Sequence, residues 1–137
     1  MTTRQVADST TDKRVLVVDD NEMNGSYIAT VLGKHPFAVD LVSDGPSALA
    51  AIEHHRPDLV LLDVMMPGMS GIEVLETLRA NPSFASIPVI LVTAKSLDRD
   101  ILTGYQVGAD YFITKPFTPR QLLHGIGLVL GMRLLDH

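Results

Sequence analysis

Short apolar runs recur along the chain, and each is followed by a segment with apolar residues at helical spacing. The runs are rich in Val, Ile and Leu and end at polar or turn-forming residues, which is typical of buried strands. The predicted strands cover residues 14–19, 37–42, 58–63, 89–93 and 111–114. The predicted helices cover residues 23–33, 45–54, 71–80, 96–107 and 118–133. This alternation predicts an α/β fold in which helices cover both faces of a parallel sheet.

Composition is consistent with one domain that needs no covalent cross-links. The 137 residues include no Cys, which excludes disulfides, thiolate metal sites and a Cys nucleophile. Acids outnumber bases by 16 to 11, and no basic run is present, so direct binding to nucleic acid is not expected. No apolar stretch approaches the ~20 residues of a membrane span. We therefore expect a cytoplasmic protein.

The expected organisation is a single domain over residues 14–133. Residues 1–13 are polar and rich in Thr, and they are interpreted as a disordered leader. Residues 134–137 are interpreted as a tail or the start of a linker. Because the sequence ends within the apolar pair Leu134-Leu135, truncation of a longer protein is slightly favoured over a stand-alone chain.

Chemistry-bearing residues stand where four of the predicted strands end. Asp19 and Asp20 follow the first strand, Asp63 ends the third, Thr93 ends the fourth, and Lys115 follows the fifth. The carboxyl ends of parallel strands share one edge, which is where open α/β sheets bind ligands. Three carboxylates there repel one another unless a cation joins them. Oxygen ligands without His or Cys favour Mg²⁺, with Mn²⁺ as the alternative.

The same constellation is suited to phosphoryl chemistry. Lys115 supplies a positive charge and Thr93 a hydroxyl for an anion held beside the metal. A carboxylate can act as nucleophile and carry the phosphoryl group as an acyl phosphate. Asp63 is the best candidate because it stands alone after an almost wholly apolar strand. Asp19 and Asp20 are better suited to metal ligation.

These residues resemble the receiver domain of two-component response regulators. The resemblance rests on Asp19-Asp20, Asp63, Thr93-Ala94 and Lys115-Pro116-Phe117, in this order and on the corresponding elements. Supporting segments are Met66-Pro67-Gly68-Met69-Ser70-Gly71 and Gly108-Ala109-Asp110-Tyr111. The resemblance covers residues 14–133. It implies a flavodoxin-like, doubly wound sheet of five parallel strands with five helices.

The resemblance also implies a role for each matched residue. Asp63 would accept a phosphoryl group from a histidine of a sensor histidine kinase or a phosphotransfer protein. Asp20 would bind Mg²⁺ directly, Asp19 would assist partly through water, and the main-chain carbonyl of Met65 would complete the protein ligands with Asp63. Lys115 would contact the phosphoryl oxygens through a loop with a cis Lys-Pro bond. The domain would be a signalling module and not an enzyme, beyond its own phosphotransfer and autodephosphorylation.

A second set of implied roles concerns switching. Thr93 would turn inward to bond the phosphoryl group, and Phe112, three residues before the lysine, would move with it as the aromatic switch. Tyr111 is one position away from that role. The last predicted helix carries no Asp, Glu, Lys or Arg from Gln121 to Met132, which fits either a slightly hydrophobic surface helix or an interface. We expect association through the fourth helix, fifth strand and fifth helix, either as a homodimer or with a downstream output domain.

Two other function classes compete with this interpretation. A phosphorylation-independent interaction module would not need Asp20, Asp63, Thr93 and Lys115 together. A Mg²⁺-dependent phosphohydrolase with Asp63 as nucleophile would need a second acid two residues later, where this chain has Met65. Both are therefore less favoured than a phosphoacceptor domain.

Overall fold

A single parallel sheet forms the centre of the molecule. The computed structural model describes residues 12–94 and 98–135, without the side chains of residues 98–102. The strands are β1 (Lys13–Val18), β2 (Phe37–Val42), β3 (Leu59–Asp63), β4 (Val89–Thr93) and β5 (Tyr111–Thr114). They are arranged in the order β2-β1-β3-β4-β5. The chain moves outward from β1 first to one side and then to the other, which confirms the doubly wound fold.

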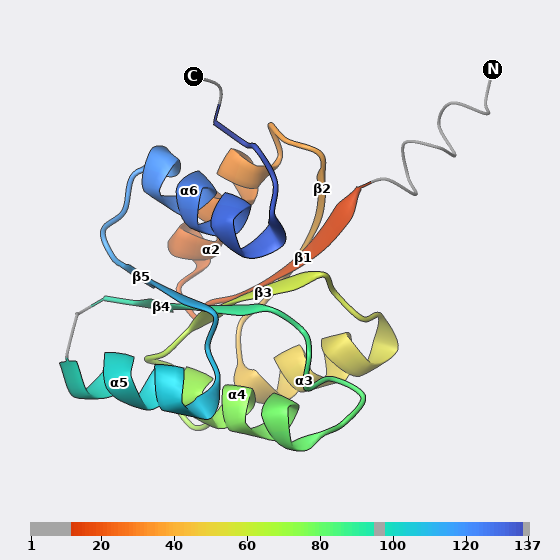
Figure 1. Ribbon diagram of the computed structural model, residues 1–137, viewed down its shortest axis with the longest axis vertical. Coiled ribbons are helices and arrows are strands. Elements are labelled where there is room, and N and C mark those ends of the chain that lie inside the picture. The colour runs from red at the N-terminus through yellow and green to blue at the C-terminus, as the bar shows by residue number, and fades with distance from the viewer. Residues whose placement is uncertain (1–11, 95–97, 136–137) are drawn as a thin grey trace.

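Five described helices cover the two faces of the sheet. They are α2 (Glu22–Leu32), α3 (Gly45–His54), α4 (Gly71–Ala80), α5 (Asp98–Val107) and α6 (Pro119–Leu130). Figure 1 shows α2 and α6 on one face and α3, α4 and α5 on the other. The predicted fourth and fifth helices are thus α5 and α6.

Alternating strand residues supply two separate cores. On one face, Leu16, Val60 and Leu91 are buried against α3 and α4. On the other face, Val17 and Leu61 are buried against α2 and α6. Strands buried on both faces must be apolar at every position, which explains the unbroken apolar runs in the sequence.

Two predicted boundaries differ from the structure. Lys13, assigned to the leader, is the first residue of β1 and pairs with Phe37. The last helix ends at Leu130 and not near residue 133, because Gly131 adopts a left-handed conformation (φ 67°) and Met132 N–H donates to the Gly127 carbonyl at 2.9 Å. The predicted leader up to residue 11 and the predicted helix start at Ser96 lie outside the described residues.

Side-chain caps start four helices at the edge where the strands end. Asn21, Asp44, Ser70 and Thr118 each accept a bond from a backbone N–H in the first turn of the helix that follows. Glu73 and Gln121 complete capping boxes at α4 and α6. These caps fix where each chain segment turns back after its strand, and they therefore order the loops around the carboxyl edge.

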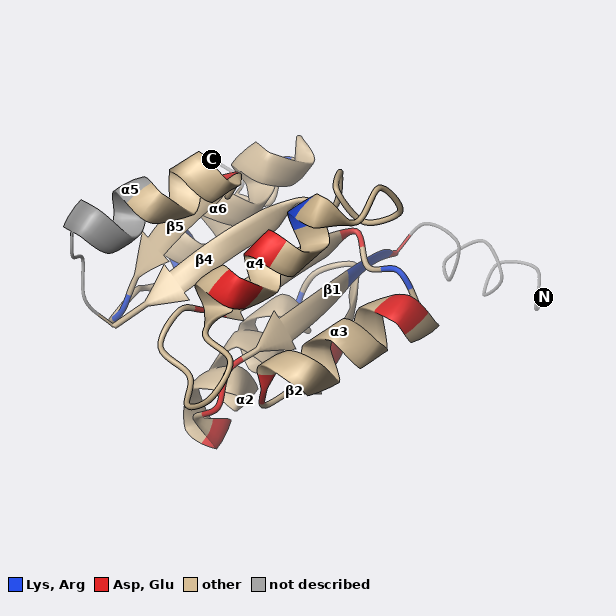
Figure 2. Ribbon diagram, turned by 90° about the horizontal axis from the view of Figure 1, so that it is seen from below, with Lys and Arg blue, Asp and Glu red and all other residues tan. Residues whose placement is uncertain are grey.

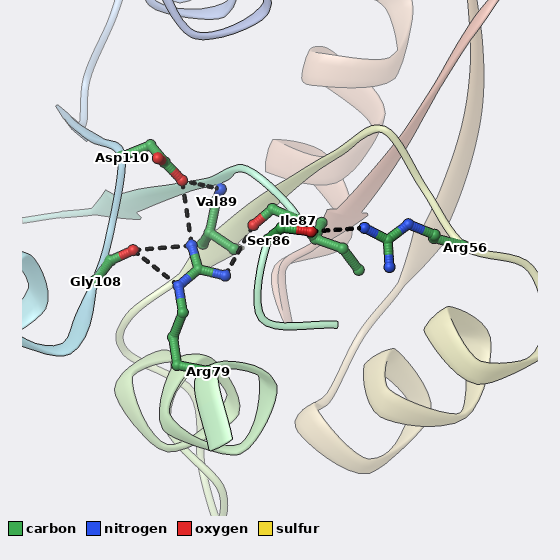
Figure 3. A network of polar contacts seen from close by, with 7 residues as sticks. All are labelled: Arg56, Arg79, Ser86, Ile87, Val89, Gly108 and Asp110. Carbon is green, nitrogen blue, oxygen red and sulfur yellow. Dashed lines mark hydrogen bonds and ion pairs between the residues drawn. The ribbon is translucent and has the colours of Figure 1, made fainter. Parts of the chain in front are cut away.

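Arginines fasten the opposite edge of the sheet (Figure 3). Arg79, in the last turn of α4, donates to the carbonyl oxygens of Ile87 at 2.8 Å and Gly108 at 2.8 and 3.0 Å. Its guanidinium also pairs with Asp110 at 3.2 Å, and the same carboxylate oxygen accepts Val89 N–H at 2.8 Å. One side chain thus ties α4 to the segments that lead into β4 and β5.

The outer surfaces of the helices differ in charge. Figure 2 looks onto α3 and α4 and shows acidic positions on both helices; Glu53, Glu73 and Glu76 are exposed. In α6, part of the uncharged surface is used within the molecule, since Val129 and Leu130 pack against the core on this face, as do Met132, Leu134 and Leu135 of the following segment. Leu128 nevertheless stays 57% exposed. None of the helices in the described part of the chain has the length and apolarity that crossing a membrane requires.

Candidate phosphoryl and metal site

The structure brings the predicted strand-end residues to one place. Asp19 and Asp20 directly follow β1, and Asp63 and Thr93 are the last residues of β3 and β4. Since β1 pairs with β3 and β3 with β4, these ends lie side by side. Lys115 directly follows β5 and reaches across to β1 and β3. The site therefore lies at the β1–β3 switch point of the sheet.

Three carboxylates form the acidic half of the site. Ligand oxygens of Asp19, Asp20 and Asp63 lie within 4.8 Å of one another, and no other group of three His, Cys, Asp or Glu among the described residues meets that criterion. Asp19 and Asp63 are each 4% exposed, whereas Asp20 is exposed. An all-oxygen set that is open on one side suits Mg²⁺, which keeps several positions for water or phosphoryl oxygens. The residues present thus fit the predicted metal.

Lys115 is the cationic half of the site. Its Nζ donates to Asp19 Oδ2 at 2.9 Å and lies 3.6 Å from Asp63 Oδ2, and its side chain is 14% exposed. The Lys115–Pro116 bond is cis, as the resemblance implied. Lys115 N–H also donates to the Thr93 carbonyl at 2.6 Å, which ties the loop after β5 to the end of β4. The ammonium group partly offsets two buried carboxylates.

Backbone N–H groups orient the two buried carboxylates. Asn21 N–H donates to Asp19 Oδ1 at 2.9 Å, and Met65 N–H donates to Asp63 Oδ1 at 3.2 Å. Each acid therefore has one oxygen held by its own loop and the other directed toward Lys115. This arrangement leaves Asp63 Oδ2 facing the shared centre of the site.

The electrostatics of Asp63 favour a bound cation. Burial raises its pKa from 3.8 to about 6; Lys115 opposes this rise, and the Asp19 carboxylate adds to it. An added divalent cation would favour the ionised carboxylate, which is the nucleophilic form. The same cation would compensate the repulsion between the acids.

The proposed switch residues lie on neighbouring strands. Thr93 is buried at the end of β4. Phe112 is half-buried and belongs to the face covered by α5, where its ring lies 5.6 Å from the ring of Tyr105. Tyr111 belongs to the opposite face, beside Gly125 of α6. Phe112 and Tyr111 therefore lie on opposite faces of the sheet.

Some features of the site were not evident from the sequence. The bond from Asn21 to Asp19 and the tilted ring contact between Tyr27 and Phe117, with centroids 5.8 Å apart, were missed. Asn before an acidic first turn is a helix-start signal that could have identified Asn21. The Tyr27–Phe117 contact joins α2 to the loop that carries Lys115, and no local sequence pattern indicates it.

Comparison with known proteins identifies the family. The model of the response regulator receiver domain matches residues 15–126. The sensory transduction protein RegX3 of Mycolicibacterium smegmatis is 46% identical over 116 residues; the match covers 85% of this chain and 50% of RegX3, so this chain spans about half the length of that relative.

Two solved structures are similar throughout the fold. The chemotaxis protein CheY4 of Vibrio cholerae has a TM-score of 0.83 at 30% identity, covering 88% of this chain and 100% of CheY4. The receiver domain of sensor histidine kinase PA1611 from Pseudomonas aeruginosa has a TM-score of 0.81 at 29% identity, covering 88% and 99% of the two chains. That structure has a magnesium ion coordinated in its active site cleft. This chain belongs to the response regulator receiver domain family.

Proposed function

We propose that Asp63 is the phosphoacceptor of this receiver domain and that its phosphorylation requires Mg²⁺. The observation that carries the proposal is the convergence of Asp19, Asp20, Asp63 and Lys115 on one point. Asp63 Oδ2 would form the new bond to phosphorus while the phosphorus–nitrogen bond of a donor phosphohistidine breaks and the imidazole leaves. Lys115 would exchange its carboxylate partners for phosphoryl oxygens.

The metal would be held by Asp19, Asp20, Asp63 and the main-chain carbonyl of Met65. When bound, Mg²⁺ would supply positive charge for the phosphoryl oxygens and for the transition state. The three carboxylates support this assignment, and the magnesium-bound PA1611 receiver domain is a precedent in a similar fold. Mn²⁺ would fit the same oxygen ligands.

The protein partner in this proposal is a sensor histidine kinase or a histidine phosphotransfer protein. Because Asp63 is buried, a donor histidine has to approach through the open side of the site. A cavity of about 510 Å³ lies beside Lys115, lined by Asn24, Tyr27, Ala94, Lys115, Pro116 and Phe117. Its aromatic walls offer apolar surface to a docked protein. Kinase and receiver would meet in the cytoplasm, a compartment that the absence of Cys suits.

The output surface in this proposal consists of α5, β5 and α6. Strand β5 is at an edge of the sheet, and Tyr105 on α5 is exposed next to the switch residue Phe112. Inward movement of Thr93 and Phe112 would therefore change a surface that a second copy or an output domain can bind. Sedimentation at high protein concentration, with and without beryllofluoride, tests the homodimer. A monomer under both conditions would rule out self-association through this surface.

The decisive experiment for the phosphoacceptor is intact-mass analysis after incubation with acetyl phosphate and Mg²⁺. We expect a single phosphoryl adduct on the wild-type chain and none on Asp63→Asn or in the presence of a chelator. Glu76→Gln, which removes an exposed acid on α4, is the matched charge control and should be modified like the wild type. An adduct that persists in Asp63→Asn would place the acceptor elsewhere.

A further inference from the structure

Gly71, the first residue of α4, lies directly against the backbone of Asp63. A Cβ atom at position 71 would collide with the Asp63 carbonyl oxygen and would lie 2.9 Å from both the Asp63 carbonyl carbon and Val64 Cα. Real Cβ atoms essentially never lie within 3.0 Å of a non-bonded heavy atom. Neither backbone segment can yield easily, because Asp63 belongs to β3 and residue 71 begins a helix. Glycine is therefore required here for steric reasons, not for its backbone angles.

The same contact closes the loop between β3 and α4. Gly71 N–H donates to the Val64 carbonyl at 3.0 Å, so residues 64–71 form a closed loop whose two ends touch. Met65 is carried by this loop, with its side chain 62% exposed and its N–H bonded to Asp63 Oδ1. The position of the Met65 carbonyl relative to Asp63 thus depends on how closely α4 approaches β3.

A second glycine contact lies in the middle of this loop, at Met69. The side chain of Met69 lies against Gly45 at the start of α3, where an added Cβ would approach Met69 atoms at 2.8 to 2.9 Å. The Sδ and Cγ atoms of Met69 could move by side-chain rotation, whereas its Cβ atom, at 2.9 Å, follows the backbone, so the loop would shift at Met69 while Asp63 stays in place. Gly68 in the same loop has a φ of 76° and no atom near its Cβ direction. Glycine thus has a different role at each of three places around this loop. Gly71 allows close approach to the Asp63 backbone, Gly45 accommodates Met69, and Gly68 adopts a left-handed backbone conformation.

We propose that Gly71 is a positioning residue for Mg²⁺ binding and phosphoryl acceptance: it allows α4 to close on β3 and so fixes the Asp63 carboxylate and the Met65 carbonyl at the separation that the metal requires. This inference rests on the proposed function of the site. Gly71 touches neither metal nor phosphoryl group in this proposal and acts through Asp63 and Val64. A side chain of any size at position 71 would push α4 away from Asp63 and Val64, and so displace the segment that carries the Asp63 and Met65 ligands.

Three alanine variants test the proposal by calorimetric titration with Mg²⁺ alone, alongside thermal unfolding. We expect Gly71→Ala to bind Mg²⁺ at least about 10-fold more weakly, the range seen when groups that orient metal ligands are altered. Gly45→Ala should weaken Mg²⁺ binding less than Gly71→Ala, since it displaces the loop at Met69 and not at Asp63. Gly68→Ala should lose stability because of its left-handed backbone but retain its Mg²⁺ affinity. It is thus the control for loop destabilisation without displacement of Asp63.

Each outcome decides the proposal. Unchanged Mg²⁺ affinity in Gly71→Ala, or equal losses in all three variants, would overturn it. A wild-type chain that binds no Mg²⁺ would instead contradict the proposed function itself. If Gly71→Ala does not fold, the wild-type chain provides the test through ¹⁵N NMR with Mg²⁺. The amide signal of Gly71 should then shift with the same midpoint as that of Met65, and a Gly71 signal that does not respond would overturn the proposal.

Discussion

At the scale of single residues, Asp63 is held in a way that costs stability until a cation arrives. Its side chain is buried, and the nearby Asp19 carboxylate carries the same charge. Lys115 compensates the negative charge of Asp63 only in part, because its Nζ lies 2.9 Å from Asp19 but 3.6 Å from Asp63. Such a conflict at a binding site is expected where the missing charge is supplied by the ligand.

Asp63→Asn should therefore stabilise the chain in the absence of divalent cations. The folded pKa of about 6 lies above the ordinary value of 3.8, so folding favours the protonated acid and ionisation weakens the fold. At pH 7, above the folded pKa, ionisation of Asp63 lowers the free energy of unfolding by on the order of 1–3 kcal/mol once partial solvent screening is allowed for. The advantage of the variant should shrink as the pH falls from about 6 toward 4. Urea unfolding in a chelating buffer at several pH values measures it.

Glu76→Gln is the control for the loss of one negative charge, because this acid is exposed on α4. It should change the free energy of unfolding by less than about 0.5 kcal/mol at pH 7. A stabilisation by Asp63→Asn that stays constant between pH 4 and pH 7 would contradict the argument, since it would not arise from ionisation.

The sequence predicted which residues meet but not how they contact one another. The order of strand ends placed Asp19, Asp20, Asp63, Thr93 and Lys115 at one edge, because parallel strands share that edge. It could not predict that Lys115 bonds more closely to Asp19 than to Asp63, since that depends on the path of the loop after β5.

The close approach of Gly71 to Asp63 was also invisible in the sequence. A glycine at a helix start gives no sign of what lies against it. Contacts of this kind depend on the distance between two elements, which no local pattern encodes.

At the scale of elements, helix α5 packs closely against the ring of Phe112 through Gly104. Gly104 faces that ring and the side chain of Leu91, so that an added Cβ would lie 2.6 Å from Phe112 Cε2 and 2.7 Å from Leu91 Cδ1. The Tyr105 ring lies beside Phe112 on the same helix. The helix therefore approaches β4 and β5 closely only because residue 104 has no side chain.

Gly104→Ala should destabilise the chain by about 1–3 kcal/mol through overpacking, although Ala is the better helix former. Gly25→Ala in α2 is the matched control, because its Cβ would meet only Leu41, whose side chain is 43% exposed and free to move. That variant should be neutral or slightly stabilising. Urea unfolding of the two variants compares them directly, and equal effects would show that helix propensity, not the Phe112 contact, determines the result.

Element positions were predicted well because periodicity and caps act locally. The five strands and the starts of α3, α4 and α6 agree with the pattern of apolar runs, Pro and capping residues. The end of α6 was predicted three residues too late, since the apolar residues continue beyond it. Met132, Leu134 and Leu135 are apolar because they pack back on the core, not because they extend the helix. Apolar residues thus indicate burial but not the element that achieves it.

At the scale of the whole molecule, the two edges of the sheet differ in how well their polar groups are paired. The carboxyl edge gathers loops, helix starts and charged groups that are only partly compensated. The opposite edge is closed by Arg79, which bonds to Ile87, Gly108 and Asp110, and by Arg56, which bonds to Ser86 (Figure 3). Arg56 also donates to the Ser83 carbonyl oxygen. Rigid fastening at one edge leaves the other free to respond to a ligand.

Arg79→Met tests whether the two edges of the sheet act independently. The variant replaces arginine with an unbranched apolar side chain and removes every hydrogen-bond donor of the guanidinium. The carbonyl groups of Ile87 and Gly108 would each lose a charged donor, and Asp110 would lose its ion pair. We expect the free energy of unfolding to fall by about 2–4 kcal/mol. Mg²⁺ affinity should stay within about 2-fold of the wild type, because Arg79 contacts none of the carboxylates of the site.

Arg79→Lys is the companion variant for this experiment. It keeps the charge, but its three donors all lie on one nitrogen and cannot reach the Ile87 carbonyl, the Gly108 carbonyl and Asp110 as the guanidinium fork does, so it should recover only part of the lost stability. Calorimetric titration with Mg²⁺ and urea unfolding of both variants provide the two readouts. A large loss of Mg²⁺ affinity in Arg79→Met, at a temperature where the chain is fully folded, would mean that the two edges are coupled through α4. In that case the fastening edge would itself be part of the switch, and the contact of α4 with Asp63 at Gly71 would be its route to the site.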